Sequence, residues 1–263
     1  MKAKHQRRKN LRLYTQKYVP EFHQSLATPT AEIAGFPVRP GLFDVFGAIM
    51  LPVGVNFTVQ THYGTSCTLL LFHRNAAEPY ARLPFPEAYK IGDVYSMIVF
   101  DLDIEEFEYA YQIDGPSDPK NGLTFDPHAV LLDPYARSVA GHRIWGDKKI
   151  DGYHARVVRD VFDWGVMPQS SRTMSDLVIY ELHVRGFTYH PSSKVAHPGT
   201  FAGLKEKIPY LKELGINAVE LMPIFEFDET MNSREVDGKT LLDYWGYNTV
   251  GFFAPNIRYN STE

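Results

Sequence analysis

The chain has 263 residues, 44% of them hydrophobic, which is long enough for one large domain or two of ordinary size with a buried core. Its formal net charge of −4 gives no general attraction to polyanions, so the composition argues against a nucleic-acid partner. No stretch approaches the roughly 20 consecutive apolar residues of a membrane-spanning helix, so we expect no membrane association.

The N-terminal residues are basic. The first twenty contain no acid and these basic residues: Lys2, Lys4, Arg7, Arg8, Lys9, Arg12 and Lys17. They hold no apolar run like that of a secretory signal, so we expect a solvated arm over residues 1–34, with an organelle-targeting peptide as the alternative. The single cysteine, Cys67, lies in an apolar run and should be a buried free thiol. Nothing asks for an oxidising compartment, and we expect a cytoplasmic protein.

Residues 53–113 alternate between apolar and polar side chains, which is the period of half-buried strands. One run, at 95–102, is apolar on both faces, as in a strand that is covered on both sides. Short strands separated by Pro, Gly and Asp clusters predict an antiparallel, immunoglobulin-like β-sandwich over residues 35–140. The insert at 75–93 contains proline and should be a long loop or an edge excursion.

Residues 114–164 are rich in turn-forming pairs such as Asp126-Pro127 and Asp133-Pro134. Proline at this density excludes a continuous helix or a central strand. The apolar residues Leu131, Leu132 and Tyr135 favour an ordered linker that packs over its neighbours rather than a flexible tether. We assign the connector to residues 141–175.

The hydrophobic period changes after Asp176. The run at 177–184 is almost continuously apolar, which predicts a strand buried on both faces. A helix should follow, with Thr200 as its N-cap and Gly215 at its end, and with Pro209 kinking it or starting its second half. The next apolar run, at 216–224, completes a βαβ unit with parallel strands.

Three strings in this region carry a resemblance: DLVIYELHVRGFT, PGTFAGLKEKIPYLKELGINAVELMPIFEF and YWGYNTVGFFAP. They resemble the start of the catalytic barrel in α-amylase-superfamily glycoside hydrolases, most closely the isoamylases and glycogen-debranching enzymes. The string DGPSDPKNGLTFDPHAVLLDPYAR resembles the connector of debranching enzymes, and the sandwich resembles the glucan-associated module that precedes their barrel.

The resemblance implies a β-sandwich followed by an incomplete TIM (β/α) barrel over residues 176–263. It implies retaining hydrolysis of α-1,6 branch points in a branched α-glucan such as glycogen, amylopectin or limit dextrin, without a cofactor or a catalytic metal.

A retaining glycosidase needs two carboxyl groups roughly 5–5.5 Å apart. The resemblance implies that the family's catalytic acids come from the fourth, fifth and seventh barrel strands, and none of these lies within the 263 residues. We therefore assign no catalytic residue and expect the chain alone to be inactive. The alternative is a non-catalytic glucan-binding or scaffold fragment. Because Trp145, Trp164 and Trp245 are the only tryptophans, the sandwich has none, which favours a scaffold role for it.

One substrate contact follows from the resemblance: Tyr247, in the Gly-Tyr pair, would stack on the sugar ring on the non-reducing side of the cleaved bond. Trp245 would add a second wall, since aromatic planes suit the apolar C–H faces of pyranose rings. Packing within the loop is the alternative for both. Glu226 is a weaker substrate-binding candidate that would face the cleft or help to hold a structural calcium ion.

The other ionisable residues of this region receive plainer interpretations. The acids at 226–229 are expected mainly to be solvated surface charges. For His183 and Arg185 we expect a packed histidine and an ion-paired arginine. Glu181 and Glu220 lie within predicted strands, where barrel packing or a salt bridge is expected.

Overall fold

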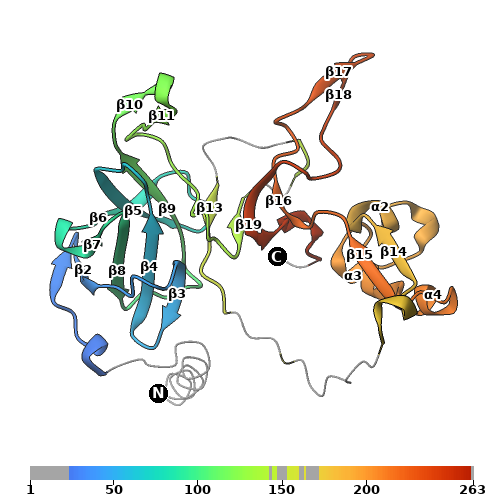
Figure 1. The fold of residues 1–263 in the computed structure, drawn as a ribbon, viewed down its shortest axis with the longest axis horizontal. Coiled ribbons are helices and arrows are strands. Elements are labelled where there is room, and N and C mark those ends of the chain that lie inside the picture. Colours follow the sequence, from blue (N-terminus) through green and yellow to red (C-terminus); the bar gives the residue numbers. More distant parts are fainter. Residues whose placement is uncertain (1–23, 142–143, 147–152, 160–162, 164–171, 262–263) are drawn as a thin grey trace. The chain divides into compact units, whose positions relative to one another are not determined.

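The computed structural model describes residues 24–141, 144–146, 153–159, 163 and 172–261 (Figure 1). The basic side chains at positions 2–17 therefore lie outside the described residues. The chain divides into two compact units, the first within 1–141 and 149–161 and the second within 142–148 and 162–263. No described helix is long and apolar enough to cross a membrane.

The first unit contains two antiparallel sheets. One has the strand order β1-β2-β8-β4-β3, with β7 also paired to β8. Its strands are β1 (Ala31–Ile33), β2 (Phe36–Pro40), β8 (Val94–Phe100), β4 (Gly54–Gln60), β3 (Gly47–Leu51) and β7 (Lys90–Ile91). The other has the order β12-β13-β9-β5-β6. Its strands are β12 (Val139–Ala140), β13 (His154–Ala155), β9 (Phe107–Asp114), β5 (Ser66–His73) and β6 (Pro79–Pro84).

The main core of this unit lies between the two sheets. Phe57 of β4 and Tyr109 of β9 are fully or almost fully buried, and their rings meet edge to face with centroids 5.2 Å apart. Cys67 is a buried free thiol in the same core, as predicted. The alternating residues of β4 and β9 thus face each other, and the antiparallel sandwich is confirmed.

The insert at 75–93 is the edge excursion rather than a loop. It contains β6, the edge strand of the second sheet, and the short helix η2 (Glu87–Tyr89). Small elements complete this unit: η1 (Gln24–Ala27), β10 (Ser117–Asp118), η3 (Pro119–Asn121) and β11 (Leu123–Thr124).

The turn-rich segment after the sandwich strands is ordered where it is described. Leu131 forms two backbone hydrogen bonds with Tyr111 of β9, N to O at 2.8 Å and 2.9 Å. Leu132 packs against the sandwich core. The expectation of an ordered linker is therefore confirmed for these residues.

Asp133 is fully buried at the centre of this linker. Its carboxylate accepts hydrogen bonds from Tyr109 Oη at 2.7 Å and from Tyr135 N at 2.8 Å. Burial raises the pKa of Asp133 from its ordinary 3.8 to about 6, and the two hydrogen bonds oppose this rise only in part.

We expect Asp133 to make the stability of the first unit depend on pH. Between about pH 4 and about pH 6 the folded protein keeps a proton that the unfolded chain has lost, so the free energy of unfolding falls as pH rises. The fall is at most about 3 kcal/mol, and it levels off above this window. Urea unfolding of the wild type and of Asp133→Asn across the window measures it. Equal pH slopes in the two proteins would show that Asp133 is not responsible.

The second unit begins with a parallel βαβ arrangement, as predicted. Strands β14 (Ile179–Leu182) and β15 (Ala218–Leu221) pair in parallel, and helices α2 (Val184–Thr188), α3 (Phe201–Glu206) and α4 (Ile208–Glu213) lie between them in sequence (Figure 1). The short helices η5 (Met174–Asp176) and η6 (Pro191–Ser193) flank β14 and α2 in the chain.

The predicted helix signals are confirmed in detail. The Thr200 side chain accepts a hydrogen bond from Gly203 N at 3.1 Å and caps α3. Pro209 lies in the first turn of α4, where its missing N–H costs nothing, so the helix restarts there. Gly215 takes a φ of +87°, the left-handed conformation that ends a helix.

The burial of the first parallel strand was predicted wrongly. Residues 177–184 do not form one strand buried on both faces, because β14 covers only Ile179–Leu182 and α2 begins at Val184. Ile179 is 50% exposed and Val219 of β15 is 42% exposed. In the described residues the sheet has two strands, so each keeps an unpaired edge and an exposed apolar surface.

The second unit ends in an antiparallel ribbon. Strand β16 (Phe225–Phe227) pairs with β19 (Thr249–Pro255), and η7 (Ile257–Tyr259) follows. Between them the hairpin of β17 (Arg234–Val236) and β18 (Lys239–Leu241) projects outward (Figure 1). Both hairpin strands are exposed throughout.

Candidate functional site

The segment Asp243–Tyr247, which we call the aromatic loop, forms a tight turn beside the ribbon. The Asp243 carboxylate accepts hydrogen bonds from Trp245 N at 3.0 Å and from Gly246 N at 3.4 Å. Asp243 N donates to Glu229 O at 2.8 Å, which closes the base of the hairpin. Gly246 has a φ of +79°, and a Cβ there would lie 3.0 Å from the Phe227 ring, so a larger residue would be strained and would crowd that ring.

This turn carries two exposed aromatic side chains. Trp245 is 52% exposed and Tyr247 is 71% exposed. Tyr244, between Asp243 and Trp245, is half-buried. The aromatic loop therefore presents two flat side chains to solvent while its backbone is fixed from behind.

The acids at 226–229 are buried, so the expectation of solvated surface charges is wrong. Glu226 and Glu229 have no exposed surface, and Asp228 is 5% exposed. Their burial is possible because Arg258, whose side chain is 2% exposed, pairs with both Glu226 and Glu229.

Arg258 forms the centre of a buried ionic cluster. It donates to Glu229 Oε1, and its Nη2 lies 3.8 Å from Glu226 Oε1. Glu229 Oε1 also accepts from Gly146 N at 2.9 Å. Burial alone would raise the pKa of Glu229, but the hydrogen bonds from Arg258 and Gly146 hold that pKa below its ordinary value. The Arg258 guanidinium also lies 4.0 Å from the centroid of the Trp145 ring.

Glu226 is thus engaged by protein groups. Its Oε2 accepts from Ile257 N at 3.0 Å, and Arg258 lies beside its other oxygen. The Arg258 guanidinium supplies the positive charge beside Glu226. This argues against the interpretation of Glu226 as a calcium ligand. Among the described residues, His, Cys, Asp and Glu side chains do not gather in a group of three or more that could hold a metal ion.

His183 is packed, as predicted. It is 7% exposed and caps α2, because its Nδ1 accepts a hydrogen bond from Gly186 N at 3.0 Å. Burial is the main cause that lowers the pKa of His183, and the charge of Arg185 adds to it.

Arg185 differs from its predicted ion-paired state. Its guanidinium lies 4.1 Å from the centroid of the Tyr189 ring and 4.7 Å from that of the Trp145 ring. The partners of Arg185 in the described part of the chain are therefore aromatic faces.

Glu181 and Glu220 also differ from expectation. They are exposed and lie directly in register on the parallel strands β14 and β15. Neither barrel packing nor a salt bridge accounts for them among the described residues.

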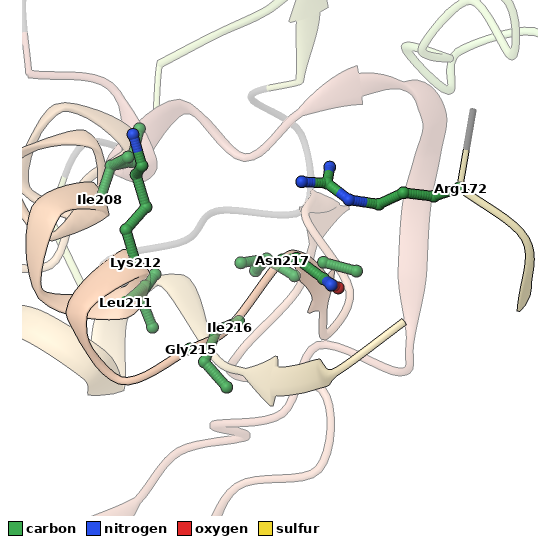
Figure 2. A pocket seen from close by; sticks show the side chains of 9 residues that line it. Arg172, Ile208, Leu211, Lys212, Gly215, Ile216 and Asn217 are labelled. Carbon is green, nitrogen blue, oxygen red and sulfur yellow. The ribbon is translucent and has the colours of Figure 1, made fainter. Parts of the chain in front are cut away.

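A cavity of about 570 Å³ lies beside α4 and the start of β15. Figure 2 shows Arg172 and Lys212 on opposite sides of it, with Asn217 and apolar residues between them. The Asn217 side chain is already used, since it accepts from Val178 N and donates to Asp176 O, both at 2.8 Å. None of the residues that line the cavity is aromatic, so it does not suit the stacking of a sugar ring.

Sequence reasoning missed Arg258, Trp145 and Tyr244. Arg258 is 29 residues from Glu229 in the chain, and no local spacing reveals such a pair. One weak signal was present: an arginine within the aromatic string FFAPNIRY hints at a buried charge that needs a partner.

We compared the sequence and the fold with those of known proteins. Residues 45–136 match the sequence family described as Carbohydrate-binding module 48 (Isoamylase N-terminal domain). Isoamylase 1, chloroplastic, of Arabidopsis thaliana is 37% identical over 240 residues, which are 86% of this chain and 30% of that protein. The chain is thus similar to the family of isoamylases and glycogen-debranching enzymes.

A second relative of this family, the Glycogen debranching enzyme of Serratia proteamaculans, is 33% identical over 241 residues, which are 85% of this chain and 35% of that protein. The chain thus spans about a third of the length of the curated relatives it matches. Among solved structures, apo pullulanase from Paenibacillus barengoltzii aligns with a TM-score of 0.64 and 21% identity, over 83% of this chain and 32% of that chain. At that identity the likeness concerns the fold alone.

Proposed function

We propose that this chain is the substrate-facing N-terminal part of a debranching glycoside hydrolase. Its substrate would be a branched α-glucan, cleaved at α-1,6 linkages with retention. The observation that carries the proposal is the aromatic loop, which exposes Trp245 and Tyr247 while the buried cluster of Arg258 fixes the strands on which it rests. The names of the relatives, isoamylase and glycogen debranching enzyme, support the substrate class.

The chemistry of the exposed rings fits a sugar. The axial C–H groups of a pyranose form an apolar face that packs on an aromatic plane, while its hydroxyl groups remain in water. We propose that Tyr247 stacks on the ring next to the cleaved bond and that Trp245 forms the second wall. Glu226 is proposed only as a supporting residue, because contact with sugar would require η7 to leave its carboxylate.

We further propose that β14, the helices α2 to α4 and β15 are the first βαβ unit of a (β/α)8 barrel. The parallel pairing supports this. The open edge of β15 and the cavity beside α4 are where the next strand and helix of such a barrel would pack. The proposed organisation is an arm at 1–34, the sandwich at 35–140, a connector at 141–175 and barrel residues at 176–263. A cytoplasmic location is proposed as well.

A non-catalytic glucan-binding protein is the second candidate, and one observation favours it. On the first unit, the rings of His73 and Tyr80 stack with centroids 4.3 Å apart, and Phe36 lies 6.4 Å from Tyr80. Tyr80 is 41% exposed, so this aromatic strip could hold a glucan chain without any catalysis.

Substitution of Tyr247 tests the proposal. We expect Tyr247→Ala to weaken the binding of maltoheptaose about tenfold, a loss of about 1.4 kcal/mol, because the stacking plane is removed. Tyr247→Phe keeps the plane and should stay within about threefold of the wild type. Isothermal titration calorimetry at high ligand concentration measures both.

Tyr63→Ala serves as the control, since it removes an exposed tyrosine of the first unit, and Tyr80→Ala tests the second candidate. If Tyr80→Ala weakens binding and Tyr247→Ala does not, the second candidate replaces the first. If Ala and Phe at position 247 are equivalent, ring stacking is not the source of affinity.

A further inference from the structure

His183 connects three elements of the second unit that are far apart in sequence. It follows β14 and caps α2 through Nδ1, which accepts from Gly186 N at 3.0 Å. An acceptor nitrogen carries no proton, so the neutral ring has its hydrogen on Nε2. That Nε2 lies 3.2 Å from Tyr259 Oη, within hydrogen-bonding distance, which ties the ring to η7.

The flat face of the same ring supports the aromatic loop. The imidazole stacks on Tyr244 with centroids 4.4 Å apart and planes inclined by 20°. Trp245 meets the imidazole edge-on at 6.1 Å and 87°, and it meets Tyr244 at 5.4 Å and 86°. One side chain therefore touches two of the three aromatic residues in the loop.

Gly186 shows how closely Tyr244 is seated over α2. A Cβ at position 186 would lie 2.4 Å from Tyr244 Oη, well inside any allowed contact. The base of the loop is closed separately, by the hydrogen bond from Asp243 N to Glu229 O. Beyond its base, the loop is held by the stack of His183 on Tyr244, together with a hydrogen bond between the His183 side chain and the Tyr244 backbone.

We propose that His183 is a positioning residue, which holds the aromatic loop in its glucan-binding orientation through its stack on Tyr244. The capping bond to Gly186 orients the imidazole, and the imidazole orients Tyr244, Trp245 and Tyr247 in turn. The glucan part of this inference rests on the proposed function; the positioning part does not.

Two substitutions separate the cap from the stack. Asparagine is a favoured N-cap and keeps an acceptor for Gly186 N but has no ring. Phenylalanine keeps a ring for Tyr244 but has no acceptor. Amide hydrogen exchange followed by NMR reads the two functions independently, at Gly186 for the cap and at Trp245 and Gly246 for the loop.

In His183→Asn we expect Gly186 to stay protected while Trp245 and Gly246 exchange at least about tenfold faster. In His183→Phe we expect faster exchange at Gly186, while Trp245 and Gly246 stay protected. Tyr244→Ala, which leaves the histidine in place, should reproduce the loop result of His183→Asn with Gly186 protected. Slow exchange of Trp245 and Gly246 in His183→Asn or Tyr244→Ala would overturn the proposal, as would fast exchange there in His183→Phe.

The glucan part is measured with maltoheptaose. His183→Asn should weaken binding at least about threefold, and His183→Phe should restore it. If the exchange patterns appear as expected but the wild type binds no maltoheptaose, the proposed function fails while His183 keeps its positioning role. If the wild type binds and His183→Asn binds equally well, the positioning role fails while the proposed function stands.

Discussion

We expect Arg258→Met to lower the free energy of unfolding of the second unit by about 3–5 kcal/mol. The substitution removes the cation that donates to Glu229 and lies 3.8 Å from Glu226, and both of these carboxylates are without exposed surface. Methionine is similar in length, so lost packing is a small part of the effect. Urea unfolding followed by tryptophan fluorescence measures it, because Trp145 lies 4.0 Å from the Arg258 guanidinium.

Arg74→Met is the matched control, and its unfolding is followed by far-ultraviolet circular dichroism because the sandwich has no tryptophan. Arg74 pairs with Glu105 at 3.2 Å, but its side chain is 37% exposed and that of Glu105 is 54% exposed. Surface pairs of this kind contribute about 0–1 kcal/mol. A loss below about 1 kcal/mol in Arg258→Met, or losses of the same size in both variants, would show that the cluster does not hold the second unit together.

A polypeptide of residues 1–263 should release no reducing sugar from amylopectin above a blank. General acid and nucleophile act as a unit, so their joint absence removes the reaction rather than slowing it. The resemblance places both groups on later barrel strands, and the acids of 226–229 are buried. A preparation free of host amylases, assayed over hours at high protein concentration, checks this.

Activity that persists through purification would contradict the expectation. The variants Glu181→Gln and Glu220→Gln would then identify the source, since these two acids are exposed and in register on neighbouring strands. Loss of that activity in either variant would assign the chemistry to this pair.

Local chemistry made part of the fold predictable. The alternation at 53–59 predicted β4, and the cap, proline and glycine at positions 200, 209 and 215 predicted the broken helix α3–α4. Each of these signals acts within a few residues of the structure that it determines.

The features that failed depend on distant partners. The apolar run at 177–184 looks like a buried strand, but Ile179 is half exposed because burial depends on neighbouring elements that the run itself does not specify. The acids of 226–229 looked solvated because their partner, Arg258, is about 30 residues away. Trp145 is farther still, 82 residues before Phe227, on whose ring it packs at 5.8 Å.

The candidate site was predicted from the family resemblance and not from the physical chemistry of the residues in the loop. Nothing in the composition of the aromatic loop distinguishes a ligand-binding tyrosine from a packed one. The structure adds the exposed fractions of Trp245 and Tyr247 and the His183 contact behind them. Exposure and this contact depend on the tertiary structure, and no spacing of residues within the loop predicts them.

Binding of maltoheptaose to the chain, mapped by NMR, tests the central claim most directly. The three tryptophan indole signals are separated by comparison with Trp245→Phe. We predict that the Trp245 signal and the amides of the aromatic loop shift on titration, while the amides around Tyr80 on β6 do not. Shifts confined to β6, or no shift at Trp245 at saturating glucan, would contradict the claim that the aromatic loop is the glucan-contact surface.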